Sequence, residues 1–164
     1  DLIYKMVLKV PSPPPAGSPA SLNTLSDHLR KMRLERGLRQ AEVAKLLKAD
    51  KQTVCNWEKH RHKPTITESG RICAFLGYDP FPDPDTLPGK MLKYRKLRGL
   101  TIKTAAGQAG VDPSSWSAWE TERRPPSEPS ASKVARFLEK IAREPSSDLP
   151  PLLPRPVEAS SWHE

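Results

Sequence analysis

Apolar residues recur with helical spacing twice within residues 37–64, and the positions between them are polar or charged. The spacing predicts two short helices, over residues 40–47 and 51–59, joined by a tight turn. Each helix has one apolar face directed toward a core and one polar face directed outward. Asp50 stands at the N-cap of the second helix, where its carboxylate can accept hydrogen bonds from backbone N–H groups. The positions expected in the core are Val43, Ala44, Leu47, Val54 and Trp57.

Helical spacing continues on both sides of this pair. A preceding helix is expected to begin near Leu25 and end at Gly37, and a following helix covers residues 67–76. The four helices predict one small domain over residues 22–82. Residues 1–21 before it form an N-terminal segment and a Pro-rich linker, whose composition does not favour a folded core.

The same pattern returns after a shift of 62 positions, and no gap is needed to align the two copies. The repeat predicts a second, degenerate helix-turn-helix domain over residues 87–143, after a linker at 83–86. The predicted fold is all-α, with a Pro-rich tail at 144–164 that we expect to be disordered. The helices expected in the second copy cover residues 88–98, 102–109, 113–122 and 131–142. Matching pairs are Gly37 and Gly99, Leu38 and Leu100, Trp57 and Trp119, Glu58 and Glu120, and Pro64 and Pro126.

The charge of the chain points to an anionic partner. The 164 residues carry 27 Lys and Arg against 19 Asp and Glu, a formal charge of +8. The excess lies on the two helical domains, with +5 over residues 25–80 and +6 over residues 87–140, which favours nucleic acid. No apolar run approaches the roughly 20 residues of a membrane span. The two cysteines, Cys55 and Cys73, both fall in helical patterns and suit reduced thiols in a cytoplasm.

The residues around the predicted turn resemble a known motif. The pattern G-L-x-Q-x-E-x-A-x-x-L, followed by V-x-x-W-E and a closing proline, resembles the helix-turn-helix of the Cro/cI-type (XRE-like) repressors. The resemblance implies lambda-repressor-like domains that bind double-stranded DNA as a transcriptional regulator or repressor, without a cofactor. Two positions depart from the family: Arg39 replaces the usual capping Ser or Thr, and His60 replaces the usual glycine. The matching positions are Gly37, Leu38, Gln40, Glu42, Ala44, Leu47, Trp57, Glu58 and Pro64.

The outward face of the helix over 51–59 carries the candidate base-reading residues. Amide side chains can bind adenine through two hydrogen bonds, and lysine can bind guanine or phosphate. The candidates for base contacts are Lys51, Gln52, Thr53 and Asn56. Gln40 resembles the family's phosphate-contacting residue, and long cations beyond the recognition helix also suit phosphate. The candidates for phosphate contacts are Gln40, Lys59, Arg61, Lys63, Arg123 and Arg124.

The second copy is the weaker reader of DNA. Its replacements for Gln40, Gln52 and Asn56 are Ile102, Ser114 and Ala118.

Some residues of the two helix pairs are expected to have structural roles. Glu58 is expected to satisfy backbone groups or to pair with an arginine of the first helix, such as Arg33 or Arg36. Trp119 is expected in the second core, whereas the pattern leaves Trp116 either buried or exposed.

Other functions find less support in the sequence. The histidines and cysteines match no zinc spacing, and no set of residues suits an enzyme. The alternatives left open are a protein-binding module, such as an antitoxin or assembly factor, and the targeting segment of a mobile-element protein. A homodimer and an intramolecular pairing of the two domains are both open. We expect a cytoplasmic, bacterial-type protein associated with the nucleoid, with no membrane partner.

Overall fold

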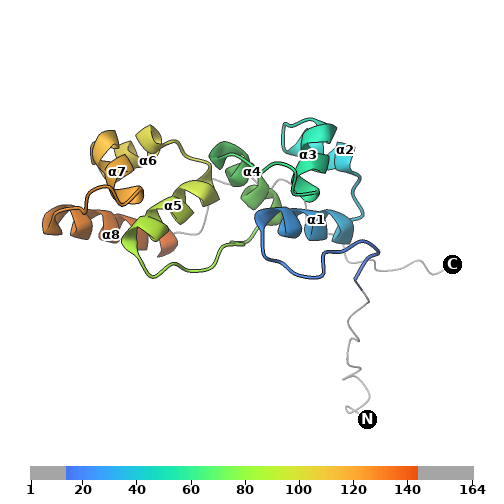
Figure 1. The fold of residues 1–164 in the computed structure, drawn as a ribbon, viewed down its shortest axis with the longest axis horizontal. Coiled ribbons are helices and arrows are strands. Elements are labelled where there is room, and N and C mark those ends of the chain that lie inside the picture. The colour runs from blue at the N-terminus through green and yellow to red at the C-terminus, as the bar shows by residue number, and fades with distance from the viewer. Residues whose placement is uncertain (1–13, 144–164) are drawn as a thin grey trace, which may run out of the picture.

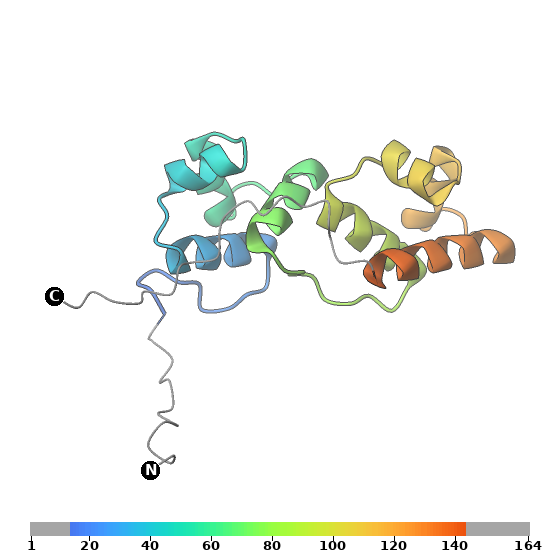
Figure 2. The same cartoon turned by 180° about the vertical axis from the view of Figure 1, so that it is seen from behind.

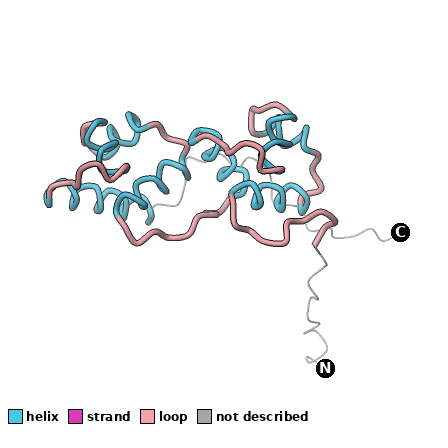
Figure 3. Tube along the Cα trace, in the orientation of Figure 1, coloured by secondary structure: helices cyan, strands magenta, loops and turns pink. Residues whose placement is uncertain are grey.

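The computed structural model describes residues 14–143 and contains eight helices and no strand within that range (Figures 1 and 3). The expected N-terminal segment, up to residue 13, and the expected tail from residue 144 lie outside the described residues. We call α1–α4 the first copy and α5–α8 the second copy. The helices are α1 (Leu25–Glu35), α2 (Gln40–Leu46), α3 (Lys51–Glu58), α4 (Ile66–Leu76), α5 (Leu87–Arg98), α6 (Ile102–Ala109), α7 (Pro113–Glu120) and α8 (Glu128–Arg143).

The observed helix ends differ from the expected ones by at most three residues, and the differences at α7 and α8 have a local explanation. Helix α7 ends at Glu120 instead of residue 122, because Glu122 takes a left-handed conformation with φ 57°. Helix α8 begins at Glu128, earlier than expected, and contains Pro129 in its first turn. Proline is tolerated there because the first N–H groups of a helix have no intrahelical partner.

Arg39 leaves α2 without a side-chain cap, as expected, because a guanidinium cannot accept a hydrogen bond. Glu42 compensates in part: its carboxylate accepts the backbone N–H of Arg39 at 2.6 Å. This contact is one half of a capping box. The equivalent helix of the second copy has the ordinary cap, since the hydroxyl of Thr101 accepts the backbone N–H of Thr104 at 3.2 Å.

The expectation for Asp50 was wrong in one respect. Asp50 has the extended backbone of an N-cap before α3, but its carboxylate accepts no capping hydrogen bond. The residue is exposed, so water can satisfy both the carboxylate and the first N–H groups of the helix. Asp112, its counterpart before α7, does cap: it accepts the backbone N–H groups of Ser114 and Ser115 at 2.9 and 3.2 Å. Hydrogen bonds from the Ser114 side chain and the Ser115 backbone lower the pKa of Asp112.

Each copy has its own apolar core. The first core contains all the residues expected in it, and both Trp57 and Trp119 are buried. The buried residues of the first core are Leu29, Val43, Ala44, Leu47, Val54, Trp57, Ile72, Phe75 and Leu76. The second core is Met91, Tyr94, Ala105, Ala106, Ala109, Trp116, Trp119 and Val134.

Side-chain volume is distributed differently in the two cores. The second copy has smaller residues on α6 than the first has on α2, and a larger one on α7 than the first has on α3. Trp116 is 0% exposed and belongs to the same core cluster as Ala105 and Ala109, so its larger volume offsets their smaller side chains. Trp116, for which the sequence pattern left both positions open, is therefore a core residue. The exchanged positions are Val43 and Ala105, Leu47 and Ala109, and Val54 and Trp116.

The two copies are joined through α4 and α5, which pack against each other in the middle of the molecule (Figures 1 and 2). Gly70 of α4 meets the backbone at the C-terminal end of α5. A Cβ atom at Gly70 would lie 2.4 Å from the backbone nitrogen of Gly99, closer than atoms can approach. Gly99 itself has φ 64° and faces the backbone of Thr67. Glycine is therefore required on both sides of this contact, which we call the α4–α5 joint.

A stability prediction follows from the left-handed residues of the two copies. Lys48, at the end of α2, has φ 52°, whereas its counterpart Gly110 has φ 66°. Because a side chain disfavours this conformation by about 1 kcal/mol, Lys48→Gly should stabilise the first copy and Gly110→Ala should destabilise the second by about that amount. Urea unfolding followed by circular dichroism measures both. Gly107→Ala is the control, since Gly107 is helical with open space around it. Gly107→Ala should raise the free energy of unfolding of the second copy. A lower free energy of unfolding would contradict the explanation by φ.

Candidate nucleic-acid interface

The outward face of α3 carries four polar side chains, the candidates for base contacts. Lys51 and Gln52 are exposed, and Thr53 and Asn56 are half-exposed. The side-chain N–H₂ group of Gln52 donates to the side-chain oxygen of Asn56 at 3.1 Å. This bond uses one donor of Gln52 and leaves the amide N–H₂ of Asn56 and the oxygen of Gln52 available. The two amides are thus held side by side with the groups that base edges recognise.

A basic turn follows α3. Its cations, Lys59, Arg61 and Lys63, are all exposed. His60 between them has φ 57°, a conformation that usually requires glycine, and its Nε2 lies 3.0 Å from the carboxylate of Asp27. Burial opposes ionisation of Asp27, but hydrogen bonds from Thr24 and the charge of His60 outweigh it and lower its pKa. The contact links the basic turn to the start of α1.

Gln40 is the first residue of α2 and is held by a buried ion pair. Its amide donates to Glu58 at 2.9 Å, and Glu58 pairs with the guanidinium of Arg33 at 2.6 and 2.8 Å. Arg33 also donates to the backbone carbonyl of Leu38 at 3.1 Å. Arg33, not Arg36, is therefore the partner of Glu58; Arg36 lies over the ring of Phe75. The network ties α1, α2 and α3 together and holds the side chain of Gln40 against Glu58.

The second copy repeats this ion pair with a different third member. Arg95 pairs with Glu120 at 2.7 and 2.5 Å and donates to the carbonyl of Leu100 at 3.2 Å. Ile102 stands where Gln40 would be and has no amide to offer. Instead, the indole N–H of Trp116 donates to Glu120 at 2.8 Å. The amide at the surface of the first copy is thus replaced by a fully buried indole, so the second network has no member at the surface of α6.

The remaining candidates lie beyond α7. Arg123 and Arg124 are exposed, in the turn that corresponds to the basic turn of the first copy. The backbone N–H of Arg123 donates to the carbonyl of Ala118 at 2.9 Å, just as that of Arg61 donates to Asn56 in the first copy. Sequence reasoning identified these cations but missed the exchange of Gln40 for Trp116. The presence of Ile102 was the available signal, since it leaves Glu120 without an amide donor from α6.

The cysteines and acidic groups provide no other site in the described part of the chain. Among residues 14–143, no group of three or more His, Cys, Asp or Glu side chains is placed to hold a metal ion. Burial raises the pKa of Cys73 to about 12, so its thiol stays protonated. Cys55 is half-buried, and neither cysteine forms a disulfide. In the same range, no helix is both long and apolar enough to cross a membrane.

Two units of four helices, each with a short helix pair joined by a tight turn, define a tandem helix-turn-helix protein. A helix-turn-helix family model matches the chain twice, over residues 29–81 and 91–141. These matches cover most of the chain and one copy each, so the chain belongs to the helix-turn-helix family of the Cro/cI (XRE) type, as a tandem repeat. No curated protein and no solved structure gives a match. The family is one of DNA-binding regulators.

Proposed function

We propose that this protein binds double-stranded DNA sequence-specifically and acts as a transcriptional repressor. In this proposal α3 enters the major groove, and Lys51, Gln52, Thr53 and Asn56 contact base edges. Phosphate is held by Gln40, Lys59, Arg61 and Lys63 beside the groove and by Arg123 and Arg124 in the second copy. Its place is with the DNA of the nucleoid, in the cytoplasm, and it catalyses no reaction.

The paired amides of Gln52 and Asn56 carry the proposal. They stand on the solvent side of a short helix whose opposite face is buried, and exposed cations follow in the next turn. An amide offers a donor and an acceptor at fixed spacing, as adenine does in the major groove. A helix serving only to support the core would have no need of this arrangement.

We propose that the two copies have different roles in DNA binding. The first copy has amides at the positions that face base edges, whereas the second has Ser114 and Ala118, which offer little for base readout. Glu122 places a negative charge near the expected phosphates. The second copy retains Arg123 and Arg124, and phosphate contacts add affinity without adding sequence preference. Its proposed contribution is therefore affinity.

Selection of bound duplexes from a random pool by the purified protein tests DNA recognition. We expect a preferred sequence to emerge. In vitro transcription from a promoter that contains this sequence then tests repression, and added protein should reduce transcript from that template alone. A pool without enrichment would contradict sequence-specific binding. An increase in transcript would replace the repressor role with an activator role.

Substitutions on α3 and in the basic turn should affect binding differently. Gln52→Ala or Asn56→Ala should weaken binding to the preferred duplex by about 1–3 kcal/mol and leave binding to a scrambled duplex intact. Arg61→Ala or Lys63→Ala should weaken both duplexes alike and reduce the salt slope by about one each. Titrations by fluorescence anisotropy across a salt series measure both effects.

Lys31→Ala is the matched control for these cations. Lys31 is a lysine of α1, outside α3 and the basic turn, and its side chain is 42% exposed and paired with Glu35. Its substitution should change neither duplex beyond the small loss due to net charge. If the amide variants lose both duplexes equally, or the cation variants lose only the preferred one, the assignment of α3 to the groove is wrong.

A further inference from the structure

The α4–α5 joint is a contact between two backbones. The three atoms nearest to a Cβ placed at Gly70 all belong to Arg98 and Gly99, at 2.4 to 2.8 Å. Because no flexible side chain separates the two helices there, the copies cannot shift along each other without a clash. Gly70 and Gly99 themselves belong to neither apolar core.

The segment between the copies, residues 77–86, makes further contacts with α5. Lys93 of α5 lies 2.7 Å from the carboxylate of Asp79 and 2.5 Å from that of Asp83. Phe81 lies beneath the ammonium of Lys96, with 5.7 Å between the nitrogen and the ring centre. Pro84 packs closely on Gly89 near the start of α5. The segment therefore follows the side of α5 and is not a free linker.

The joint pairs helices that are not equivalent. The counterpart of α4 in the second copy is α8, and the counterpart of α5 in the first is α1. Such a contact is heterologous, unlike the two-fold contact of a symmetric dimer, in which the same surface is used twice. Both helix pairs, α2–α3 and α6–α7, nevertheless lie along the same edge of the molecule, in the view from the front and in the view from behind (Figures 1 and 2).

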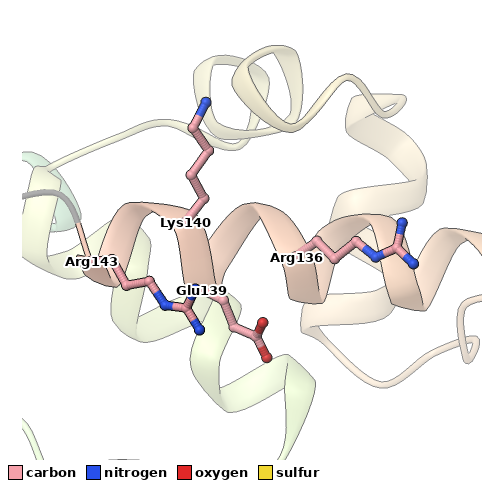
Figure 4. Close-up of a pocket in the computed structure, with 4 residues that line it drawn as sticks. All are labelled: Arg136, Glu139, Lys140 and Arg143. Carbon is pink, nitrogen blue, oxygen red and sulfur yellow. The ribbon is translucent and has the colours of Figure 1, made fainter.

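The contact is not available a second time at the far end of the chain. Gly70 corresponds to Ser132, which has the Cβ that the joint excludes, and Ala74 corresponds to Arg136. The outer side of α8 is a hollow lined by charged residues alone, whose side chains extend in different directions (Figure 4). They are Arg136, Glu139, Lys140 and Arg143. This surface of α8 does not offer the close backbone approach that α4 makes to α5.

From this geometry we infer that one chain binds one duplex as a monomer, with both copies on the same side of the DNA, at a site without two-fold symmetry. The inference rests on the proposed function and specifies its geometry. The first copy reads base edges at one end of the site, and Arg123 and Arg124 hold phosphates of an adjacent turn at the other end. Two contacts on one side of B-DNA are separated by about one turn, roughly 10 base pairs. The α4–α5 joint holds the two copies in one relative position, which the inference takes to suit this spacing.

The wild-type protein tests the inference directly. The probe is a duplex that carries the sequence selected from a random pool, extended by several turns on each side. Native mass spectrometry should show one chain for each duplex. Hydroxyl-radical footprinting should show two protected stretches on one side of the helix, and only one of them should coincide with the selected bases. Two chains for each duplex, or a palindromic selected site with symmetric protection, would overturn the inference but leave DNA binding established.

Gly70→Leu tests the joint. Its side chain should separate the copies while each core stays folded, which circular dichroism monitors. We expect an affinity loss of about tenfold to a hundredfold, a salt slope smaller by about two, and loss of the outer protected stretch, with base preference unchanged. Ser132→Leu places the same side chain at the equivalent position of α8 and should change none of these. An unchanged outer footprint in folded Gly70→Leu would overturn the role of the joint, whereas no selected sequence at all would overturn the proposed function and the inference together.

Discussion

Replacing Trp57 with alanine should unfold the first copy. The side chain is 2% exposed and packs in a core of only nine buried residues. Large-to-small substitution of a buried tryptophan costs about 3–5 kcal/mol, and a domain of this size has little stability to lose. Hydrogen exchange resolved by residue should show loss of protection over α1–α4, and urea unfolding should show the corresponding loss of helix.

Gln52→Ala provides the comparison for Trp57→Ala within the same pair of helices. The side chain of Gln52 is exposed and donates a hydrogen bond to Asn56, so its removal should leave the free energy of unfolding of the first copy within about 0.5 kcal/mol of the wild type. The second copy should keep its protection in both variants unless the α4–α5 joint transmits the loss. A folded Trp57→Ala protein with full protection over α1–α4 would show that the core of the first copy lies elsewhere.

Removing the carboxylate of Glu120 should destabilise the second copy by a comparable amount. Arg95 is only 8% exposed and has Glu120 as its partner. Without Glu120 the guanidinium stays buried without a counter-charge, and the indole N–H of Trp116 loses its acceptor. Breaking one side of a buried ion pair costs about 3–5 kcal/mol. Urea unfolding of Glu120→Ala, followed by tryptophan fluorescence and hydrogen exchange over α5–α8, measures the loss.

Two further variants show whether the loss is due to the unpaired charge. The double variant Arg95→Met with Glu120→Leu removes both charges and should recover most of the stability, because an apolar pair has no desolvation penalty. Lys31→Ala breaks a pair of the same charge type in which both side chains are more than 40% exposed, and it should cost less than about 0.5 kcal/mol. If the double variant is as unstable as Glu120→Ala, lost packing and not the charge is responsible.

The order and type of the helices could be predicted from the sequence because the apolar spacing and the caps agree. Trp57, Trp119 and the other core positions follow the same spacing, and the motif placed Glu58 beside an arginine of α1. The choice of Arg33 over Arg36 could not be predicted, since both lie near the end of one helix. It depends on which guanidinium also reaches the carbonyl of Leu38.

Contacts between elements that lie far apart in the chain could not be predicted from the sequence. Gly70 interrupts the apolar pattern of α4 with no local reason, and its role becomes evident only when α5 lies against it. In the same way, Trp116 stands at a core position but carries a polar N–H group, and whether this group finds an acceptor depends on the position of Glu120. The base and phosphate contacts remain predictions, since they concern a partner outside the chain.

The different distribution of volume in the two cores has a consequence for folding. A chain with two copies of one fold risks misassembly, because helices of one copy can pack into the other. Helix α7 packed on α2 would place the indole of Trp116 where Val43 and Leu47 already fill the space, and such overpacking costs about 1–3 kcal/mol. The reverse hybrid, α3 on α6, would leave a cavity beside the alanines of α6, which is also unfavourable. Both hybrid pairs are therefore less favourable than the native ones, and the divergence of the two cores favours the pairing of each helix pair within its own copy.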